Sequence, residues 1–209
     1  MRITHLKSTL IVAGFLACIN AAPVHADYVW LERDGRDTAT AYVGDLDARR
    51  EPAASVAGPR AYLADGKSLP VSVSTESIAI AAAGHGDVRL AATRVLPQGA
   101  LQYFHAKIGR AETKAVNDLE LVPTTPGGTT FKLVWKGTTV PASQVNVSTS
   151  AGWRRVLKPA ADGSVTLATP FPALYLLEVS AKINGSVTVE GKTYEDVRHI
   201  ATLTFEVKD

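Results

Sequence analysis

Apolar and polar residues alternate in short runs along the chain from Asp27 onward, and Gly, Pro, Asn and Asp separate these runs. Because successive side chains of a strand point to opposite faces, a period of two predicts strands with one face in a core. No long amphipathic helix, heptad or low-complexity tract competes with this pattern. The predicted fold class is therefore all-β. In the first half we expect strands over residues 28–32, 38–43, 70–74, 77–82, 88–95 and 101–107.

The second half shows the same alternation. We expect strands over residues 131–135, 140–147, 153–157, 164–168, 174–181, 187–190 and 196–207. Seven short strands are typical of an immunoglobulin-like sandwich. The apolar residues that share the inner faces predict its core: Phe131, Leu133, Trp135, Val145, Tyr175, Leu177, Val179, Leu203 and Phe205.

A break in the pattern separates the two halves. A strand near residues 117–123 ends at Pro123, which cannot donate a ladder hydrogen bond. Residues 124–130 are polar, contain two glycines and lack apolar alternation. We therefore predict an N-terminal β-sandwich over residues 27–123, a linker over 124–130 across which strand pairing stops, and a C-terminal immunoglobulin-like β-sandwich over 131–209 that folds alone.

Residues 1–26 have the parts of an export signal. Arg2 and Lys7 form a positive start, residues 8–22 are uncharged, and residues 24–26 place small side chains where a signal peptidase reads them. We expect cleavage after Ala26 and a periplasmic protein without membrane insertion, because the apolar run is too short to span a bilayer. The alternative is a lipoprotein acylated at Cys18. The apolar run continues beyond Cys18, where a lipoprotein would have a polar tether.

Charge and cysteine content exclude several classes of partner and site. Losing Arg2 and Lys7 with the signal leaves 20 basic and 20 acidic residues. Binding to phosphate backbones needs a surplus of Lys and Arg, so we expect no nucleic-acid partner. Cys18, the only cysteine, lies in the export segment. The predicted mature chain therefore has no disulfide and no thiolate ligand or nucleophile.

Three stretches together resemble a family of exported bacterial proteins of unknown function, often described as the periplasmic component of cobalt/nickel transport systems. Residues 24–32 (VHADYVWLE) resemble its His-Ala-His, two residues, Trp-Leu opening. Residues 104–107 (FHAK) and 119–123 (LELVP) are similar to its Ala-Lys strand and Leu-Glu-x-x-Pro junction. In the second half, residues 137–145 (GTTVPASQV), 161–163 (ADG) and 172–177 (PALYLL) resemble a transthyretin-like or carboxypeptidase-regulatory-like sandwich.

This resemblance implies a transthyretin-like second half and a role in nickel or cobalt handling. It also implies a partner, either a membrane metal-uptake component or another envelope protein. It bears more directly on the fold than on the function. The opening of the chain departs from the family: the second histidine is Asp27 here, and the first, His25, is expected to leave with the signal. A metal site that uses those two histidines is therefore lost or changed in this chain.

Three histidines remain after export, His85, His105 and His199. Imidazole is the main nitrogen ligand for divalent transition metals in a chain without cysteine. The three lie in different segments, so a shared site depends on the fold bringing their nitrogens within roughly 3 to 4 Å of each other. The alternative is structural: hydrogen-bonded strand residues at 105 and 199, each on a partly apolar face, and a solvated Gly-His-Gly turn at 85.

Asp27 is a fourth candidate ligand. After the predicted cleavage its carboxylate would adjoin a free α-amine, and such a pair can bind a divalent cation. The third residue of the mature chain is Val29, whereas an amino-terminal copper or nickel clamp usually has histidine there. The alternative is an ordinary acid at the chain terminus. The candidate metal ligands are thus Asp27, His85, His105 and His199, for nickel, cobalt or copper, and we expect no other cofactor.

Trp153 offers a different chemistry. It follows Gly152 and precedes Arg154 and Arg155, so a ring with flanking charges could face a sugar or a protein. The alternative is that the Trp153 ring packs over the edge of the sandwich.

Motifs for catalysis are missing from the sequence. It has no Gly-x-Ser-x-Gly elbow, no His-Glu-x-x-His and no phosphate-binding Gly-rich loop, so we expect no enzyme. The leading hypothesis is an exported non-enzymatic protein that supports binding or uptake of a transition metal. The alternative is a metal-independent envelope interaction module that binds protein or carbohydrate through its C-terminal sandwich.

Overall fold

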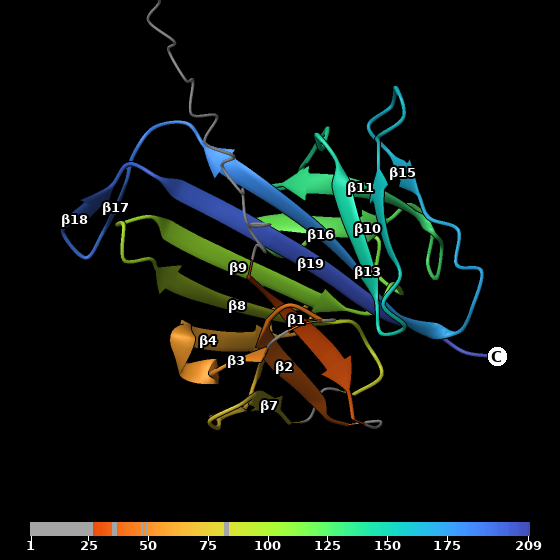
Figure 1. Ribbon diagram of the computed structural model, residues 1–209, viewed down its shortest axis with the longest axis horizontal. Coiled ribbons are helices and arrows are strands. Elements are labelled where there is room, and N and C mark those ends of the chain that lie inside the picture. The colour runs from red at the N-terminus through yellow and green to blue at the C-terminus, as the bar shows by residue number, and fades with distance from the viewer. Residues whose placement is uncertain (1–26, 35–36, 47, 49, 82–83) are drawn as a thin grey trace, which may run out of the picture.

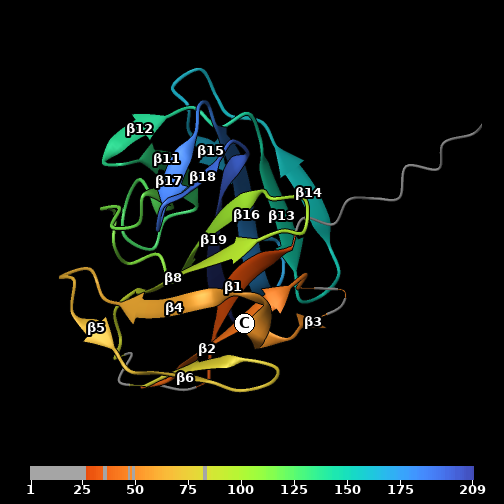
Figure 2. The same ribbon diagram turned by 90° about the vertical axis from the view of Figure 1, so that its left-hand side faces the viewer.

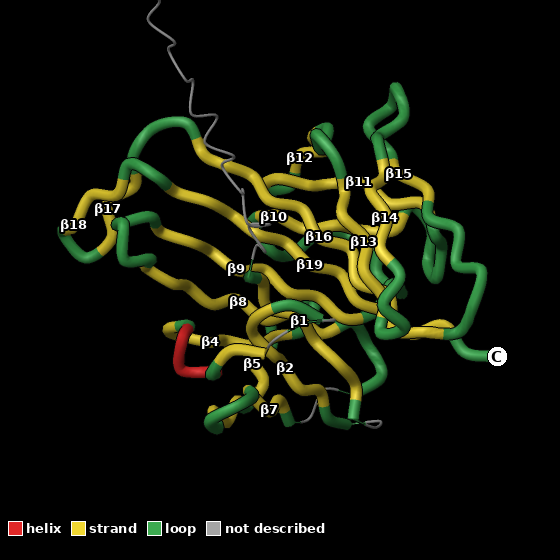
Figure 3. The backbone as a smooth tube through the Cα atoms, viewed as in Figure 1, coloured by secondary structure: helices red, strands yellow, loops and turns green. Residues whose placement is uncertain are grey.

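Strands form nearly all the regular structure of the described residues. The computed structural model describes residues 27–34, 37–46, 48, 50–81 and 84–209, and the predicted export segment lies outside them. The only helical element in this part is a short 3₁₀ turn, η1 (Ala53–Ser55), drawn in red in Figure 3. Within the same residues, no helix has the length and apolar content needed to cross a membrane. The all-β class predicted from the alternation is confirmed.

The strands follow one another along the chain in the order shown in Figure 1. Those before residue 110 are β1 (Tyr28–Arg33), β2 (Ala39–Gly44), β3 (Arg50–Glu51), β4 (Ala57–Tyr62), β5 (Ser68–Leu69), β6 (Val71–Val73), β7 (Ile78–Ile80), β8 (Val88–Val95) and β9 (Leu101–Ile108). Those after it are β10 (Leu119–Pro123), β11 (Thr130–Trp135), β12 (Thr138–Val140), β13 (Val145–Thr149), β14 (Arg154–Leu157), β15 (Val165–Thr166), β16 (Ala173–Ile183), β17 (Val187–Val189), β18 (Lys192–Tyr194) and β19 (Val197–Val207).

A sheet of eight strands runs through the middle of the described structure, in the order β14-β13-β16-β19-β9-β8-β4-β5 (Figure 1). Its neighbours pair antiparallel except for β9 and β19, which run parallel with His105 opposite Ala201. This parallel pair joins a strand from the first half of the chain to the last strand of the second half. Parallel strands are usually apolar on both faces, so each face of such a pair must be covered by other elements rather than exposed to water.

Two smaller sheets cover the two faces of the central sheet. The sheet β1-β2-β7-β6, with β3 beside β2, packs on one face, and β10-β11-β12, with β15 beside β11, packs on the other. Figure 2 shows β2 and β6 on the opposite side of the molecule from β11 and β12. At its free edge, β1 is fixed by two side chains of β19: the Thr202 and Thr204 hydroxyls donate to the carbonyls of Val29 and Leu31, each at 2.6 Å.

Each covering sheet forms its own core with the central sheet. The first core contains Trp30, Ile78, Leu90 and Phe104, together with Leu176 and Ile200 from the second half. The second core contains all the residues predicted for it from the alternation, Trp135 being only partly buried at its edge. It also contains Leu119 and Leu121 of β10.

The structure corrects our placement of the boundary between the halves. Strand pairing continues at residues 124–130, because Pro123 lies opposite Phe131 and the Thr124 amide donates to the Thr130 carbonyl at 2.8 Å. The predicted linker is therefore the turn of the β10–β11 hairpin. Apart from Leu176 and Ile200, which belong to the first core, the residues of the two cores separate along the chain between Ile108 and Leu119. The two sandwiches share the central sheet. Pro123 suggested a break in pairing because proline cannot donate a ladder hydrogen bond, but proline is tolerated at the end of a strand.

Buried charges lie where the first half meets β10. Arg89 and Lys107 are opposite each other on β8 and β9 and are both fully buried. The Glu120 carboxylate accepts from Arg89 at 3.0 Å and lies 3.4 Å from the Lys107 ammonium, which lies 3.1 Å from Asp87. The other Glu120 oxygen accepts from the amides of Val116 at 3.0 Å and of residue 117 at 2.8 Å. The cluster therefore holds the segment that leads into β10.

We predict that a fragment of residues 131–209 has no cooperative thermal transition by Trp fluorescence, whereas the chain from Asp27 has one. The fragment lacks Leu119 and Leu121 of its core, and it exposes the edge of β19 that pairs with β9. A cooperative transition of the fragment alone would show that the second core is self-sufficient.

We also predict that Glu120→Gln lowers the free energy of unfolding by about 3 kcal/mol, because it leaves buried cations without their shared carboxylate. Glu206→Gln removes an exposed partner of Lys208 and should change the free energy of unfolding by less than about 1 kcal/mol. Urea denaturation measures both. Equal losses for the two variants would contradict the role given to the cluster.

Candidate functional site

The parallel pairing of β9 and β19 brings two of the predicted site residues together. Residue 199 lies opposite Tyr103, and residue 105 lies opposite Ala201, on the same face of the sheet. The His105 Nε2 and His199 Nδ1 atoms are 2.9 Å apart, a hydrogen-bond distance. Both side chains are buried.

The two imidazole rings lie edge to edge. Their planes differ by 7° and their centroids are 5.1 Å apart. That separation is about the nitrogen–nitrogen distance plus the two ring radii, so the nitrogens face each other within nearly one plane. Tyr103 stacks on the His199 ring at 4.7 Å, and Trp135 meets it edge-on at 4.7 Å. Both aromatic rings thus pack against His199.

A cavity of about 230 Å³ opens beside His105. Tyr62 of β4, Tyr103 of β9, and Asn117 and Asp118 before β10 are among its lining residues. The Tyr62 hydroxyl donates to the Asn117 side-chain oxygen, while the Asn117 side-chain nitrogen and the His105 Nδ1 atom are buried and have no hydrogen-bond partner in the described structure. Buried polar atoms without partners are uncommon in proteins, and a bound water, an ion or a ligand is among the groups that satisfy them.

Burial makes both imidazoles weak bases. It lowers the pKa of His105 to about 4, against the opposing effects of Asp118, Glu120 and Asn117. It also lowers the pKa of His199 to about 4, and the adjacent His105 acts in the same direction. Both rings are therefore neutral at pH 7, the form in which imidazole shares a proton with a neighbour or binds a metal ion.

The other predicted site residues lie elsewhere. His85 is exposed before the start of β8, at the end of the β8–β9 pair away from His199. The Asp27 carboxylate accepts from the Arg94 guanidinium at 3.0 Å, and Arg94 also pairs with Glu51 at 2.7 Å. Trp153 meets Phe171 edge-on at 6.0 Å, so it packs at the edge of the second core.

Sequence reasoning missed the residues that surround the pair. Tyr62, Asn117 and Trp135 reach it from three different strands or loops, and the pattern assigned Trp135 only to the core. Alternation did indicate that His105 shares a face with Tyr103 and that His199 lies at the edge of an apolar face. No local spacing in the sequence could show that β9 and β19 are neighbours and that the faces with His105 and His199 adjoin.

The residues that the structure describes contain no group of three or more His, Cys, Asp or Glu side chains placed to hold a metal ion. The site thus offers two protein nitrogens. A scan against protein-family models finds no match, and a search of curated proteins finds no relative.

We predict that His105→Gln flattens the pH dependence of stability between pH 6.5 and 4. The unfolded histidine binds a proton below about pH 6.5, while the folded one stays neutral down to about 4, so this contribution to stability is present above pH 6.5 and is lost as the pH falls towards 4. The variant should lose less free energy of unfolding over this interval than the unmodified chain, by on the order of 2 kcal/mol. Urea denaturation at each pH measures this, with exposed His85→Gln as the control that keeps the original slope.

Proposed function

We propose that this chain is an exported, non-enzymatic protein of the periplasm that binds a divalent transition metal ion, nickel, cobalt or copper, at His105 and His199. The observation that carries the proposal is the 2.9 Å separation of their Nε2 and Nδ1 atoms, in two rings that burial keeps neutral. The resemblance of residues 24–32, 104–107 and 119–123 to a periplasmic cobalt/nickel transport component supports the same class of ion.

The spacing of the nitrogens favours some ions over others. Metal–imidazole bonds are about 2.0–2.1 Å long. An ion bonded to both nitrogens at their present separation would therefore have an N–metal–N angle of about 90°. That angle suits square-planar and octahedral coordination, typical of nickel, copper and cobalt, rather than tetrahedral zinc. Binding requires each ring to turn by about 45° so that both lone pairs converge on the ion, which takes the place of the shared proton.

Two protein ligands leave the remaining coordination positions to water or to a partner. Structural metal sites are closed by four protein ligands, whereas an open site can exchange its ion. The pair is therefore suited to carrying an ion to a membrane uptake component or another envelope protein. The cavity lined by Asn117 and Asp118 opens on the His105 side of the pair.

Calorimetric titration of untagged residues 27–209 with Ni²⁺, Co²⁺ and Cu²⁺ at pH 7 tests the proposal. We expect one ion per chain, at least tenfold weaker binding for His105→Gln and His199→Gln, and no change for His85→Gln. Weak, sub-stoichiometric binding by the unmodified chain would instead favour the metal-independent interaction module. Loss of binding in Asp27→Asn alone would show that the ion binds at the amino terminus and not at the histidine pair.

A further inference from the structure

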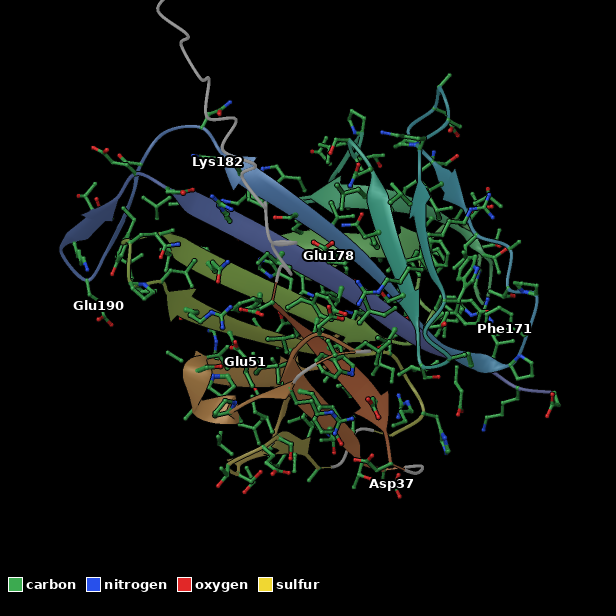
Figure 4. All side chains as sticks on the ribbon, viewed as in Figure 1. Asp37, Glu51, Phe171, Glu178, Lys182 and Glu190 are labelled. Carbon is green, nitrogen blue, oxygen red and sulfur yellow. The ribbon has the colours of Figure 1, made fainter. Side chains whose placement is uncertain are left out.

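Two cavities lie on opposite faces of the central sheet. The larger, of about 460 Å³, is lined by Glu178 of β16, which is labelled near the middle of the molecule in Figure 4. In this cavity Arg154 already pairs with Asp45 at 3.3 Å. The smaller cavity, beside His105, differs because its lining includes an acidic and a basic side chain that are not paired.

A β-bulge in β4 directs the basic side chain, that of Arg60, into the smaller cavity. The register between β4 and β8 shifts just before Arg60, because residues 58–59 of β4 face a single residue of β8. Arg60 therefore lies opposite Ala91. Regular pairing would place it opposite Leu90, whose side chain belongs to the first core. The bulge thus turns Arg60 to the other face of the central sheet.

Pairing then places three side chains in one row on the face of the histidine pair. Arg60 lies opposite Ala91 of β8, and Ala91 lies opposite His105 of β9. Two strand spacings place the backbones of Arg60 and His105 roughly 10 Å apart. Because the side chain of Ala91 is a single methyl group, it leaves the space between its two neighbours open. The cavity therefore has Arg60 on one side and His105 on the other.

The acidic side chain of the cavity is that of Asp118, in the segment before β10. The Asp118 carbonyl accepts from the Lys136 amide at 2.7 Å, which holds this segment against the turn between β11 and β12. Burial lowers the pKa of His105 and of His199, and the Asp118 carboxylate acts against this effect at both rings. The carboxylate therefore lies on the β9 side of the cavity.

Both charged groups also act on one hydroxyl, that of Tyr62, which lines the same cavity. Burial raises the pKa of Tyr62 to about 12, with Glu120 and Asp118 acting in the same direction and Arg60 in the opposite one. Arg60 and Asp118 thus approach one atom from two sides. Neither has an ion-pair partner among the described residues.

An acidic and a basic group in one small cavity suit a ligand that carries both charges. A simple anion would be attracted by Arg60 and repelled by Asp118, and a simple cation the reverse. A zwitterion gains both attractions, and its carboxylate matches the two parallel donors of a guanidinium. The volume of about 230 Å³ is below the usual range for drug-sized ligands and suits a molecule as small as an amino acid. Ala91 and the exposed Val116 offer apolar surface to its side chain.

We propose that this cavity binds a small α-amino acid, with its carboxylate at Arg60 and its ammonium group at Asp118. The site goes beyond the metal proposal and does not depend on it. It lies beside His105, but the Nε2 atom proposed to bind the ion faces His199 instead.

Calorimetric titration of residues 27–209 with L-alanine and L-valine tests this inference. We expect one amino acid per chain for at least one of the two. Isobutylamine and isovalerate each lack one charge of valine, and neither should bind at millimolar concentration. Arg60→Gln and Asp118→Asn should each weaken binding at least tenfold. Arg155→Gln is the matched control and should leave binding unchanged, because it removes an exposed arginine of β14 that is not in the lining.

Ala91→Leu tests the site without changing a charge. The larger side chain would fill the space between Arg60 and His105, so we expect at least tenfold weaker binding. Thermal unfolding of each variant shows whether it is folded before it is titrated. If a variant does not fold, the comparison of valine with its two analogues on the unmodified chain still tests both charge contacts.

Binding of neither amino acid at millimolar concentration, or equal binding of valine and either analogue, would overturn the proposal. Undiminished binding in both Arg60→Gln and Asp118→Asn would do the same. Arg60→Gln should leave the nickel titration unchanged, because Arg60 supplies no ligand to the ion. Failure of the amino-acid site is therefore distinguishable from failure of the metal site.

Discussion

The parallel pairing of β9 with β19 is the constraint on which the rest of the structure depends. It joins strands 94 residues apart at the level of His105 and His199 and makes one sheet from both halves of the chain. β19 is buried on both faces, with Ile200 in one core and Leu203 in the other. Because a buried parallel pair needs cover on each face, neither covering sheet can be removed without exposing apolar surface.

The covering sheets are narrower than the sheet they cover, and they are offset from one another. The first packs mainly over β8, β9 and β19, and the second mainly over β13, β16 and β19. Each therefore leaves a strip of the central sheet partly open. The open strip on one face contains the cavity beside His105, and the strip on the other contains the cavity with Glu178. Both cavities are thus consequences of the difference in width between the central sheet and the sheets that cover it.

The sequence predicted most strands that have regular alternation, including β8 with its observed bounds and every residue proposed for the second core. It missed β4, where Gly58 and Pro59 interrupt the alternation and the register with β8 shifts between Ala57 and Arg60. It also missed the shared sheet, because strand order depends on contacts between distant segments, which no local pattern records. For the same reason it found His105 and His199 singly, and gave no signal for Glu178, which resembles any other polar residue of a strand.

Register explains why these two cavities lie on different faces of the central sheet. On β16, residue 178 points to the first covering sheet, while Leu177 and Val179 point to the second. On β19, His199 points with Ala201 to the second. A shift of β19 by one residue would move His199 to the opposite face from His105, so the 2.9 Å contact requires the observed pairing. Since strands rather than loops supply His105 and His199, an ion at this site meets side chains whose backbone the sheet already holds in place.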